Sequence, residues 1–398
     1  MHLAETHEQE ALRKELREYF DRLLPQSVRD AMGESGEGNP EFRRIVKQMG
    51  ADGWLGLGWP KEFGGQGRPA TDQFILFDEV QRAHAPFPFV TINTVGPTIM
   101  AYGTEEQKAR FLPGILAGEL NFAIGYTEPE SGTDLASLRT TAVLDGDEWV
   151  INGNKVFTSG ANQADYVWLA CRTDQDAPKH KGISIIIVPT NSPGFSWTPI
   201  VTVGGNVTTA TYYTDVRVPK ENVVSDVNRG WQLITTQLNH ERVGLAALTA
   251  LTHRLYDDVV AWAAAEPSGG RTPDGGVERL IDLPWVQADF AKCKAILQAL
   301  KLMNWKLVRS VNDGTLTPQA SSSVKVFGTE RGVEVYKLLL GILGPFGHLR
   351  AGSPGAVLHG EVEQAGRLAQ INTFGGGVNE IQRDIVATVG LGMTRASR

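Results

Sequence analysis

The stretch FAIGYTEPESGTDLASLRTTAVLDGDEWVINGNKVFTS, residues 122–159, decides how the rest of the chain is interpreted. Phe122, Ile124 and Tyr126 alternate with small residues, which is typical of a β-strand with one buried face. Asp145-Gly146 and Asn152-Gly153 have the composition of two-residue hairpin turns. Between this strand and the two turns, the polar segment TEPESGTD (127–134) can present backbone N–H groups and hydroxyls to a polar ring edge. The stretch therefore predicts β-structure that carries a binding loop.

The composition excludes several classes of function. A chain of 398 residues can bury a sizeable core and hold two or three subdomains. Its net charge of −7 argues against a nucleic-acid partner. No apolar run reaches membrane-spanning length, and the first residues lack the layout of a signal peptide. Two isolated cysteines and eight scattered histidines show no metal-site or disulfide spacing, so we expect a cytoplasmic protein without a metal or a membrane span.

The residues before 122 have helical patterns. In the stretch 6–24, Thr6 and Gln9 form a capping-box signature, and an apolar face follows it up to Pro25. Thr104 and Gln107 repeat the capping-box signature. Further helices are expected from about residue 40, over 71–84, over 89–102 and over 104–112.

The pattern changes at Phe122 to short β-branched and aromatic runs such as 166–172 and 182–189. The helical period returns from Trp231, with one long loop predicted over 266–284 by its glycines and prolines. We therefore predict a mainly α chain with a central β-domain. Its expected domains are an N-terminal helical domain (1–121), a β-domain (122–230) and a C-terminal helical domain (231–398).

Two motifs together resemble a known family. GWLGLGWPKEFGGQG (53–67) resembles a glycine-rich segment of the acyl-CoA dehydrogenases, although alone it could equally be a surface Ω-loop. The TEPESGTD loop, followed at the right distance by KVFTSG, resembles the flavin cradle of the same family. The resemblance covers essentially the whole chain and implies the acyl-CoA dehydrogenase fold of helical bundle, β-barrel-like domain and four-helix bundle.

The resemblance also implies a reaction and a cofactor. In this family a base removes the α-proton of an acyl-CoA while N5 of FAD accepts a hydride from the β-carbon, which gives a trans-2-enoyl-CoA. Phe157 and Ser159 match an aromatic and a hydroxyl position beside the flavin, where the family more often has Trp and Thr. An ordinary strand–turn–strand with buried polar caps is the alternative interpretation. The cofactor-binding residues implied in this half of the chain are Tyr126, Thr127, Thr133, Phe157, Thr158 and Ser159.

The usual position of the base is empty. Many family members carry a glutamate shortly before an Ile-Gln-Arg helix, and counting back from Ile381 places that position at Gly376, which has no side chain. Glu380 lies about one turn into the helix, where we expect a solvated or structural carboxylate. A second group within the family places its glutamate on an earlier helix, and that position corresponds to Glu241.

Helical geometry supports Glu241 independently of the resemblance. Ile234, Leu238, Leu245 and Leu248 share its helix face, so the carboxylate should be partly desolvated and its pKa raised, which makes it a better base. A buried structural ion pair, for instance with Arg242, is the alternative. By resemblance Arg242 adjoins the substrate and orders the base loop.

Three glycines at 375–377 follow Phe374 and precede a predicted helix over 379–389. Free N–H groups at a helix N-terminus suit a phosphate or the adenosine part of a flavin. The family uses this segment against its flavin, so Phe374, Gly375 and Gly376 complete the predicted cofactor site. A plain glycine-rich turn is the alternative.

The sequence departs from homotetrameric family members at two places. The RxxFG segment is replaced by the loop 266–284, and the QxxGGxG segment appears as GILGPFG (341–347) with glycine for glutamine. Both segments reach a neighbour's flavin in the family, so a different subunit would supply those contacts here.

Further strings, among them TINTVGPTIMAYGT and TFGGGVNEIQRDIV, resemble the base-bearing subunit of heterotetrameric (α2β2) acyl-CoA dehydrogenases of steroid side-chain degradation. This implies a steroid side-chain acyl-CoA as substrate, a homologous second subunit and an electron-transfer-flavoprotein-type acceptor. Small residues at Gly244, Ala246 and Ala247 would ease a bulky substrate. A flavin oxidase or monooxygenase, a catalytically silent partner subunit and, more distantly, a nucleic-acid-binding member of the fold are the alternatives.

Overall fold

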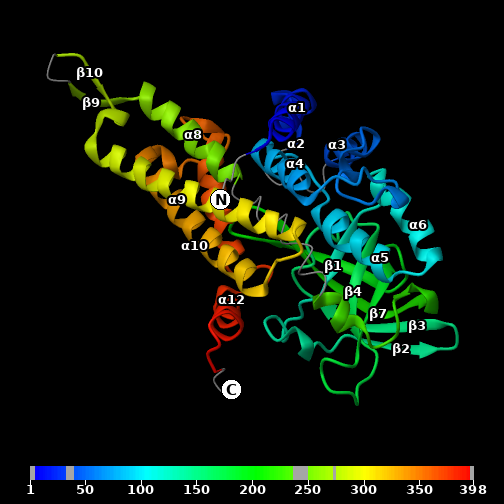
Figure 1. The fold of residues 1–398 in the computed structure, drawn as a ribbon. Helices are drawn as coiled ribbons and strands as arrows, with labels where there is room; N and C mark the ends of the chain where they lie inside the picture. The colour runs from blue at the N-terminus through cyan, green and yellow to red at the C-terminus, as the bar shows by residue number, and fades with distance from the viewer. Residues whose placement is uncertain (1–4, 33–39, 236–249, 272–274, 395–398) are drawn as a thin grey trace.

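The computed structural model describes residues 5–32, 40–235, 250–271 and 275–394. Helices before residue 117 cover one side of a central sheet, and a bundle of longer helices follows it in sequence (Figure 1). The predicted class, mainly α with a central β-domain, is confirmed by this arrangement. The domain limits at 121 and 230 stay a prediction.

The N-terminal helices begin where the sequence signals predict. Thr6 caps α1 and Thr104 caps α6, and in both capping boxes the hydroxyl accepts the N3 amide while the N3 glutamine accepts the cap amide. The elements are α1 (His7–Leu23), α2 (Gln26–Met32), α3 (Pro40–Ala51), η1 (Trp54–Gly56), η2 (Lys61–Phe63), α4 (Ala70–Ala83), a π-helical turn η3 (Thr91–Val95), α5 (Gly96–Tyr102) and α6 (Glu105–Leu116).

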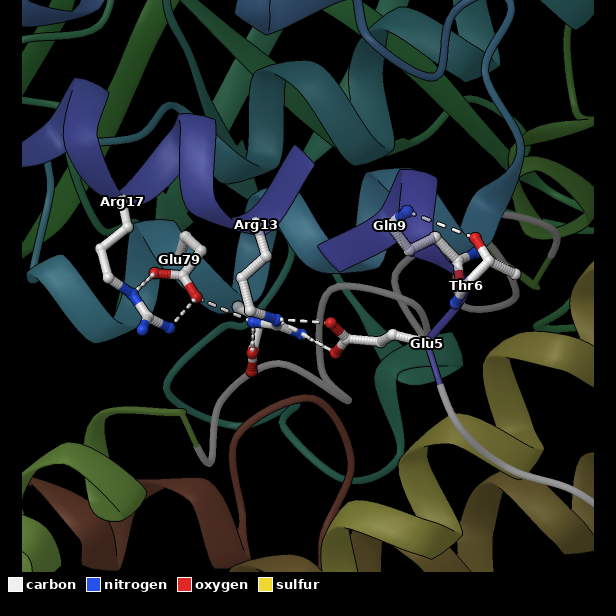
Figure 2. A network of polar contacts seen from close by, with 7 residues as sticks. Glu5, Thr6, Gln9, Arg13, Arg17 and Glu79 are labelled. Carbon is white, nitrogen blue, oxygen red and sulfur yellow. Dashed lines mark hydrogen bonds and ion pairs between the residues drawn. The ribbon is translucent and has the colours of Figure 1, made fainter. Parts of the chain in front are cut away.

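Charged side chains attach α1 to α4. Arg13 contacts Glu5, Asp78 and Glu79, and Arg17 donates to Glu79 at 2.8 Å (Figure 2). Glu79 is buried, so it needs cationic partners to offset its desolvation. Because these pairs join helices more than fifty residues apart, they fix the N-terminal helix against the body of the domain.

The strands β1 to β8 form one eight-stranded sheet of order β6-β7-β3-β2-β4-β5-β8, with β1 parallel to β4 off this path. β2 also pairs with β4 in parallel, and the remaining neighbours are antiparallel. The strands are β1 (Phe122–Gly125), β2 (Thr141–Asp145), β3 (Glu148–Lys155), β4 (Tyr166–Arg172), β5 (Ile183–Pro189), β6 (Phe195–Val201), β7 (Val207–Pro219) and β8 (Val223–Val224), with short 3-10 turns η4 (Leu135–Ser137) and η5 (Lys220–Asn222).

One of the two predicted hairpin turns is wrong. Asp145 pairs with Glu148 across the turn at Gly146, as expected. Asn152-Gly153, however, lies inside β3, where the register against β7 shifts and Gly153 adopts φ 145°. An Asn-Gly pair is equally suited to a turn or to a β-bulge, and here the strand continues because β7 pairs with both sides of the bulge.

The central strands are buried on both faces. Trp168 and Ala170 of β4 face the N-terminal helices, while Val167, Leu169 and Cys171 face a second cluster inside the β-domain. β5 follows the same alternation, which explains why both strands have continuous apolar runs. The loops at the ends of these strands are therefore attached to a sheet that is packed on both faces.

The C-terminal part is a helical bundle with its own core. The loop predicted over 266–284 is partly wrong, because β9 and β10 form a two-stranded hairpin that extends from the outer end of the bundle (Figure 1). The elements are α8 (Ala250–Ala265), β9 (Pro267–Arg271), β10 (Val277–Arg279), η7 (Leu280–Asp282), α9 (Pro284–Asn312), α10 (Pro318–Leu343), η8 (Gly344–His348), η9 (Val357–Gly360), α11 (Glu361–Leu368), η10 (Ala369–Thr373), α12 (Asn379–Ile385) and a π-helical turn η11 (Val386–Gly390).

The bundle packs onto the N-terminal domain through α4 and α9, where the rings of Phe74 and Trp305 meet edge to face at 5.3 Å. Among the described helices, none is both long and apolar enough to cross a bilayer. Within the same residues, His, Cys, Asp and Glu side chains form no group arranged to hold a metal ion.

Candidate functional site

The first half of the candidate site comes from two segments of the β-domain that lie side by side. The Val156 amide donates to the Thr127 carbonyl at 2.8 Å, so the loop after β1 runs next to the end of β3. Phe157 follows with φ 59° and a side chain that is 61% exposed. A left-handed backbone conformation costs free energy for a residue with a large aromatic side chain. Strained residues of this kind cluster at ligand-binding sites.

Thr158 and Ser159 are fixed by β7. Thr158 is fully buried, its amide donates to the Thr209 carbonyl at 2.9 Å, and the Thr209 hydroxyl donates back at 2.5 Å. The exposed Ser159 shares a hydroxyl–hydroxyl bond of 2.9 Å with Thr208. The Ser159 hydroxyl is therefore oriented at the surface, while Thr158 can offer only a packed, bonded side chain.

The other predicted residues of this half differ in exposure. The Tyr126 hydroxyl accepts from the Trp168 indole at 3.2 Å and is partly buried beside the sheet. Thr133 is exposed at the crest of the loop. Tyr126 therefore supports the loop from the inside, and Thr133 is free to meet a bound molecule.

Buried charges lie beneath this loop, and sequence reasoning missed them. Lys155 donates to the Glu128 carboxylate at 2.8 Å and to the Tyr126 carbonyl at 3.1 Å. The Arg139 and Thr140 amides also donate to Glu128, at 2.6 and 2.8 Å. Burial by itself would raise the pKa of Glu128, but Lys155 and the hydrogen bonds from Thr140 outweigh it and hold the pKa below its usual value. The sequence feature that could have indicated these charges is Lys155, a lysine at the inward-facing end of a predicted strand.

The second half of the candidate site is the turn between η10 and α12. Phe374 is 57% exposed, and the space around a Cβ at Gly376 is open. The expectation of free N–H groups here fails for Gly375, whose amide donates to the Ile371 carbonyl at 2.7 Å. Gly376 and Gly377 close the turn by adopting positive φ.

Lys325 of α10 binds the backbone of this turn, and it was not among the residues predicted from the sequence. Its ammonium contacts the Gly377 carbonyl and donates to the Thr373 carbonyl at 3.4 Å and to the Asn379 side chain at 3.0 Å. Burial lowers the pKa of Lys325 to about 8, against the attraction of Glu380 and Glu330. Glu380 itself is exposed, in agreement with the expectation of a solvated carboxylate.

The β6–β7 hairpin joins the two halves. Its β7 side bonds Thr158 and Ser159 through Thr208 and Thr209, as described above. At its tip, Arg367 of α11 donates to the Val203 carbonyl at 2.7 Å, and Leu368 lies against Gly204 so closely that a Cβ there would be 2.5 Å away. Because α11 runs directly into η10 and the Phe374–Gly376 turn, this contact ties the hairpin that bonds Thr158 and Ser159 to the helix that precedes the turn.

A cavity of about 180 Å³ opens inside the bundle between α4, α8, α9, α10 and η10. Its lining includes Gly375 from the turn, Lys325, and Thr252, whose hydroxyl donates to Tyr336 at 2.9 Å. The cavity therefore reaches from the second half of the site into the bundle.

The predicted base lies outside the described residues. Glu241, Arg242 and the small residues Gly244, Ala246 and Ala247 all fall within 236–249. Their assignment stays a prediction.

The chain matches three family models along most of its length. They are described as the acyl-CoA dehydrogenase N-terminal domain (residues 6–119), middle domain (123–216) and C-terminal domain (228–391). The curated protein acyl-CoA dehydrogenase FadE26 of Mycobacterium tuberculosis is 53% identical over 408 residues, which cover 100% of both chains. FadE29 of the same organism is 48% identical and covers 99% of each.

Solved structures agree with these matches. The structure titled "Tcur3481-Tcur3483 steroid ACAD" is 58% identical with a TM-score of 0.94, and the ChsE4-ChsE5 complex from Mycobacterium tuberculosis is 53% identical with a TM-score of 0.92. Both comparisons cover 100% of each chain. The resemblance inferred from the sequence motifs is confirmed: the chain belongs to the acyl-CoA dehydrogenase family, whose members are oxidoreductases that act on CH–CH bonds.

Proposed function

We propose that the protein is an FAD-dependent dehydrogenase that introduces a trans α,β double bond into an acyl-CoA thioester. Family membership supports the reaction class, because acyl-CoA dehydrogenases are flavoproteins. The observation that carries the proposal for this chain is the junction at the β6–β7 hairpin. It joins the Phe157–Ser159 segment to the helix that leads into the Phe374–Gly376 turn.

The side chains of both halves suit a flat, largely uncharged heterocycle. Each half exposes one phenylalanine, the Ser159 hydroxyl lies at the surface of the first half, and the Glu128 carboxylate is buried and paired with Lys155. Aromatic faces stack on conjugated rings, while hydroxyls satisfy ring nitrogens and oxygens. The residues that would hold FAD are those predicted from the sequence: Tyr126, Thr127, Thr133, Phe157, Thr158, Ser159, Phe374, Gly375 and Gly376. Bound FAD would supply the two-electron acceptor for the oxidation.

The chain itself supplies the base and the positioning. We assign the α-proton to the carboxylate of Glu241, with Arg242 ordering the segment around it. Gly376 cannot act as a base, because it has no side chain. Glu380 lies in the first turn of α12 and its side chain is exposed to solvent. In a site closed to water, a desolvated glutamate has a raised pKa and takes the proton more readily.

The substrate and the partner follow from the named relatives. The two solved complexes are heteromeric by title, and one is named a steroid acyl-CoA dehydrogenase. We therefore assign a steroid side-chain acyl-CoA as substrate, a homologous second chain as partner in an α2β2 assembly, and an electron-transfer-flavoprotein-type acceptor.

The deciding experiment is anaerobic flavin bleaching by a steroid side-chain acyl-CoA, with the chain co-purified with a homologous second chain. Glu241→Gln keeps size and hydrogen bonding but removes the basic carboxylate. We expect the variant to retain its flavin and to bleach about 10²- to 10⁴-fold more slowly, the range that general base catalysis contributes.

Glu380→Gln is the matched control, because it removes an exposed carboxylate in the first turn of α12. We expect it to bleach like the native complex. Equal bleaching by the native and Glu241→Gln complexes would assign the base elsewhere, whereas a stable, colourless native protein in every preparation would favour the silent-subunit alternative. Rapid return of the flavin colour when oxygen is admitted to the bleached complex would favour an oxidase.

A further inference from the structure

A buried ion pair lies directly beneath the predicted cofactor loop. The Lys155 side chain is fully buried and that of Glu128 is only 6% exposed, with 2.8 Å between Nζ and Oε1. Removing two charges from water costs free energy that their attraction barely offsets, so such a pair is weak evidence for a gain in stability. The buried pair therefore needs an explanation other than stabilisation of the fold.

The pair holds both ends of one irregular segment. Lys155 binds the Tyr126 carbonyl where the segment leaves β1, and Glu128 receives the Arg139 and Thr140 amides where the segment enters β2. Between these points the segment has one 3-10 turn, Leu135–Ser137, and a two-way backbone bridge between Glu128 and Ser131. Its path is therefore set mainly by side chains from below.

A third charge completes this support. Arg172, at the end of β4, donates to the carbonyls of Ala136 at 2.6 Å and Leu138 at 3.3 Å. All three charged groups thus bind backbone atoms of residues 126–140 from the inner side. The exposed Thr133 lies on the outer side, and Phe157 follows Lys155 by two residues.

We propose that Glu128 and Lys155 are positioning residues that fix the backbone of the 126–140 segment in the conformation that receives the cofactor. The inference rests on the proposed function, because it concerns the same FAD site. Neither side chain needs to touch the flavin. The pair acts through Tyr126, Thr127 and Thr133, whose backbone and hydroxyl groups it places beside the Phe157–Ser159 segment.

The test compares the native chain with the double variant Glu128→Gln/Lys155→Met. The double variant removes both charges together, so that no unpaired buried charge is left to unfold the domain. The single variants, which leave one charge unpaired, serve to measure how strongly the two groups are coupled. Arg217→Met is the matched control, because it breaks exposed ion pairs with Asp145 and Glu148 in the same domain.

Two readouts separate positioning from plain stabilisation. Hydrogen–deuterium exchange of the full-length chain without added FAD reports the segment itself, relative to peptides from β4 and β5. Quenching of FAD fluorescence on titration reports the cofactor site, with the chain alone and with the homologous second chain. For the double variant we expect an unchanged unfolding midpoint, exchange in 126–140 about 10-fold faster, and a Kd for FAD about 10- to 100-fold higher, as for other supporting groups around a bound centre.

Unchanged exchange and unchanged FAD affinity in a folded double variant would overturn the proposal. So would a uniform rise in exchange across the whole β-domain, since that result assigns the pair to global stability. If the native chain binds no FAD in either preparation, the proposed function fails, and the exchange readout still decides whether the pair positions the segment.

Discussion

At the scale of single residues, the surroundings of His253 in α8 determine the protonation state of its ring. Burial lowers its pKa to about 4, and the neighbouring Lys301 and Lys294 add to the effect against the attraction of Asp257. The folded protein therefore keeps this ring neutral at pH values where the unfolded chain binds a proton.

The pH dependence of stability should reveal this. Because the folded pKa lies below the unfolded value of about 6.5, the stabilisation is present above pH 6.5 and is lost as the pH falls towards 4. We expect the free energy of unfolding in urea to fall less steeply over this range for His253→Gln than for the native chain. His7→Gln, which alters an exposed ring on α1, should follow the native chain. Parallel curves for all three proteins would show that His253 takes up its proton in the folded state.

At the scale of elements, the sequence predicts where helices begin better than where a strand bulges or a loop contains a hairpin. The two capping boxes place the starts of α1 and α6 correctly, because each is a local bond between residues three apart. The bulge at Gly153 and the β9–β10 hairpin were not predicted. Both depend on which strand pairs with them, and glycine-rich sequence is compatible with turn, bulge and loop alike.

The bulge gives a prediction of its own. A Cβ at Gly153 would lie 2.6 Å from the Thr140 hydroxyl oxygen and 2.7 Å from the Thr140 Cα, and the residue has φ 145°. We expect Gly153→Ala to lower the free energy of unfolding by about 2–4 kcal/mol, because overpacking adds to backbone strain. Gly146→Ala is the control: its φ is also positive, but the space around its Cβ is open, so it should cost about 1 kcal/mol. Equal costs in urea unfolding would mean that Thr140 moves away without penalty.

At the scale of the whole molecule, the candidate site depends on a contact between domains. Sequence motifs predicted its residues in the β-domain and near the C-terminus, and the tip of the β6–β7 hairpin contacts α11, the helix that precedes the second group. The supporting residues Glu128, Lys155 and Lys325 were not predicted, because most of their partners are backbone atoms, whose positions the sequence does not encode locally. The assignment of Glu241 stays a prediction.

The contact at the hairpin tip can be tested with Arg367→Met, which keeps most of the apolar stem but removes the bond to the Val203 carbonyl together with the ion pair to Glu363 on the same helix. We expect a loss of about 0.5–1.5 kcal/mol in the free energy of unfolding and faster deuterium exchange in both 202–206 and 369–377. Arg331→Met, which breaks an ion pair with Glu334 at the surface of α10, is the control and should leave both segments unchanged. Faster exchange in only one of the two segments would contradict a shared contact.

The order of the segments along the chain also sets a schedule for biosynthesis. A ribosome adding about 5–20 residues per second completes the Phe157–Ser159 segment and its hairpin on the order of ten seconds before the Phe374–Gly376 turn leaves the exit tunnel. During that interval the nascent β-domain lacks Arg367, whose guanidinium donates to the Val203 carbonyl at the hairpin tip. Both halves of the proposed FAD site are therefore present only once residues 374–376 have been synthesised.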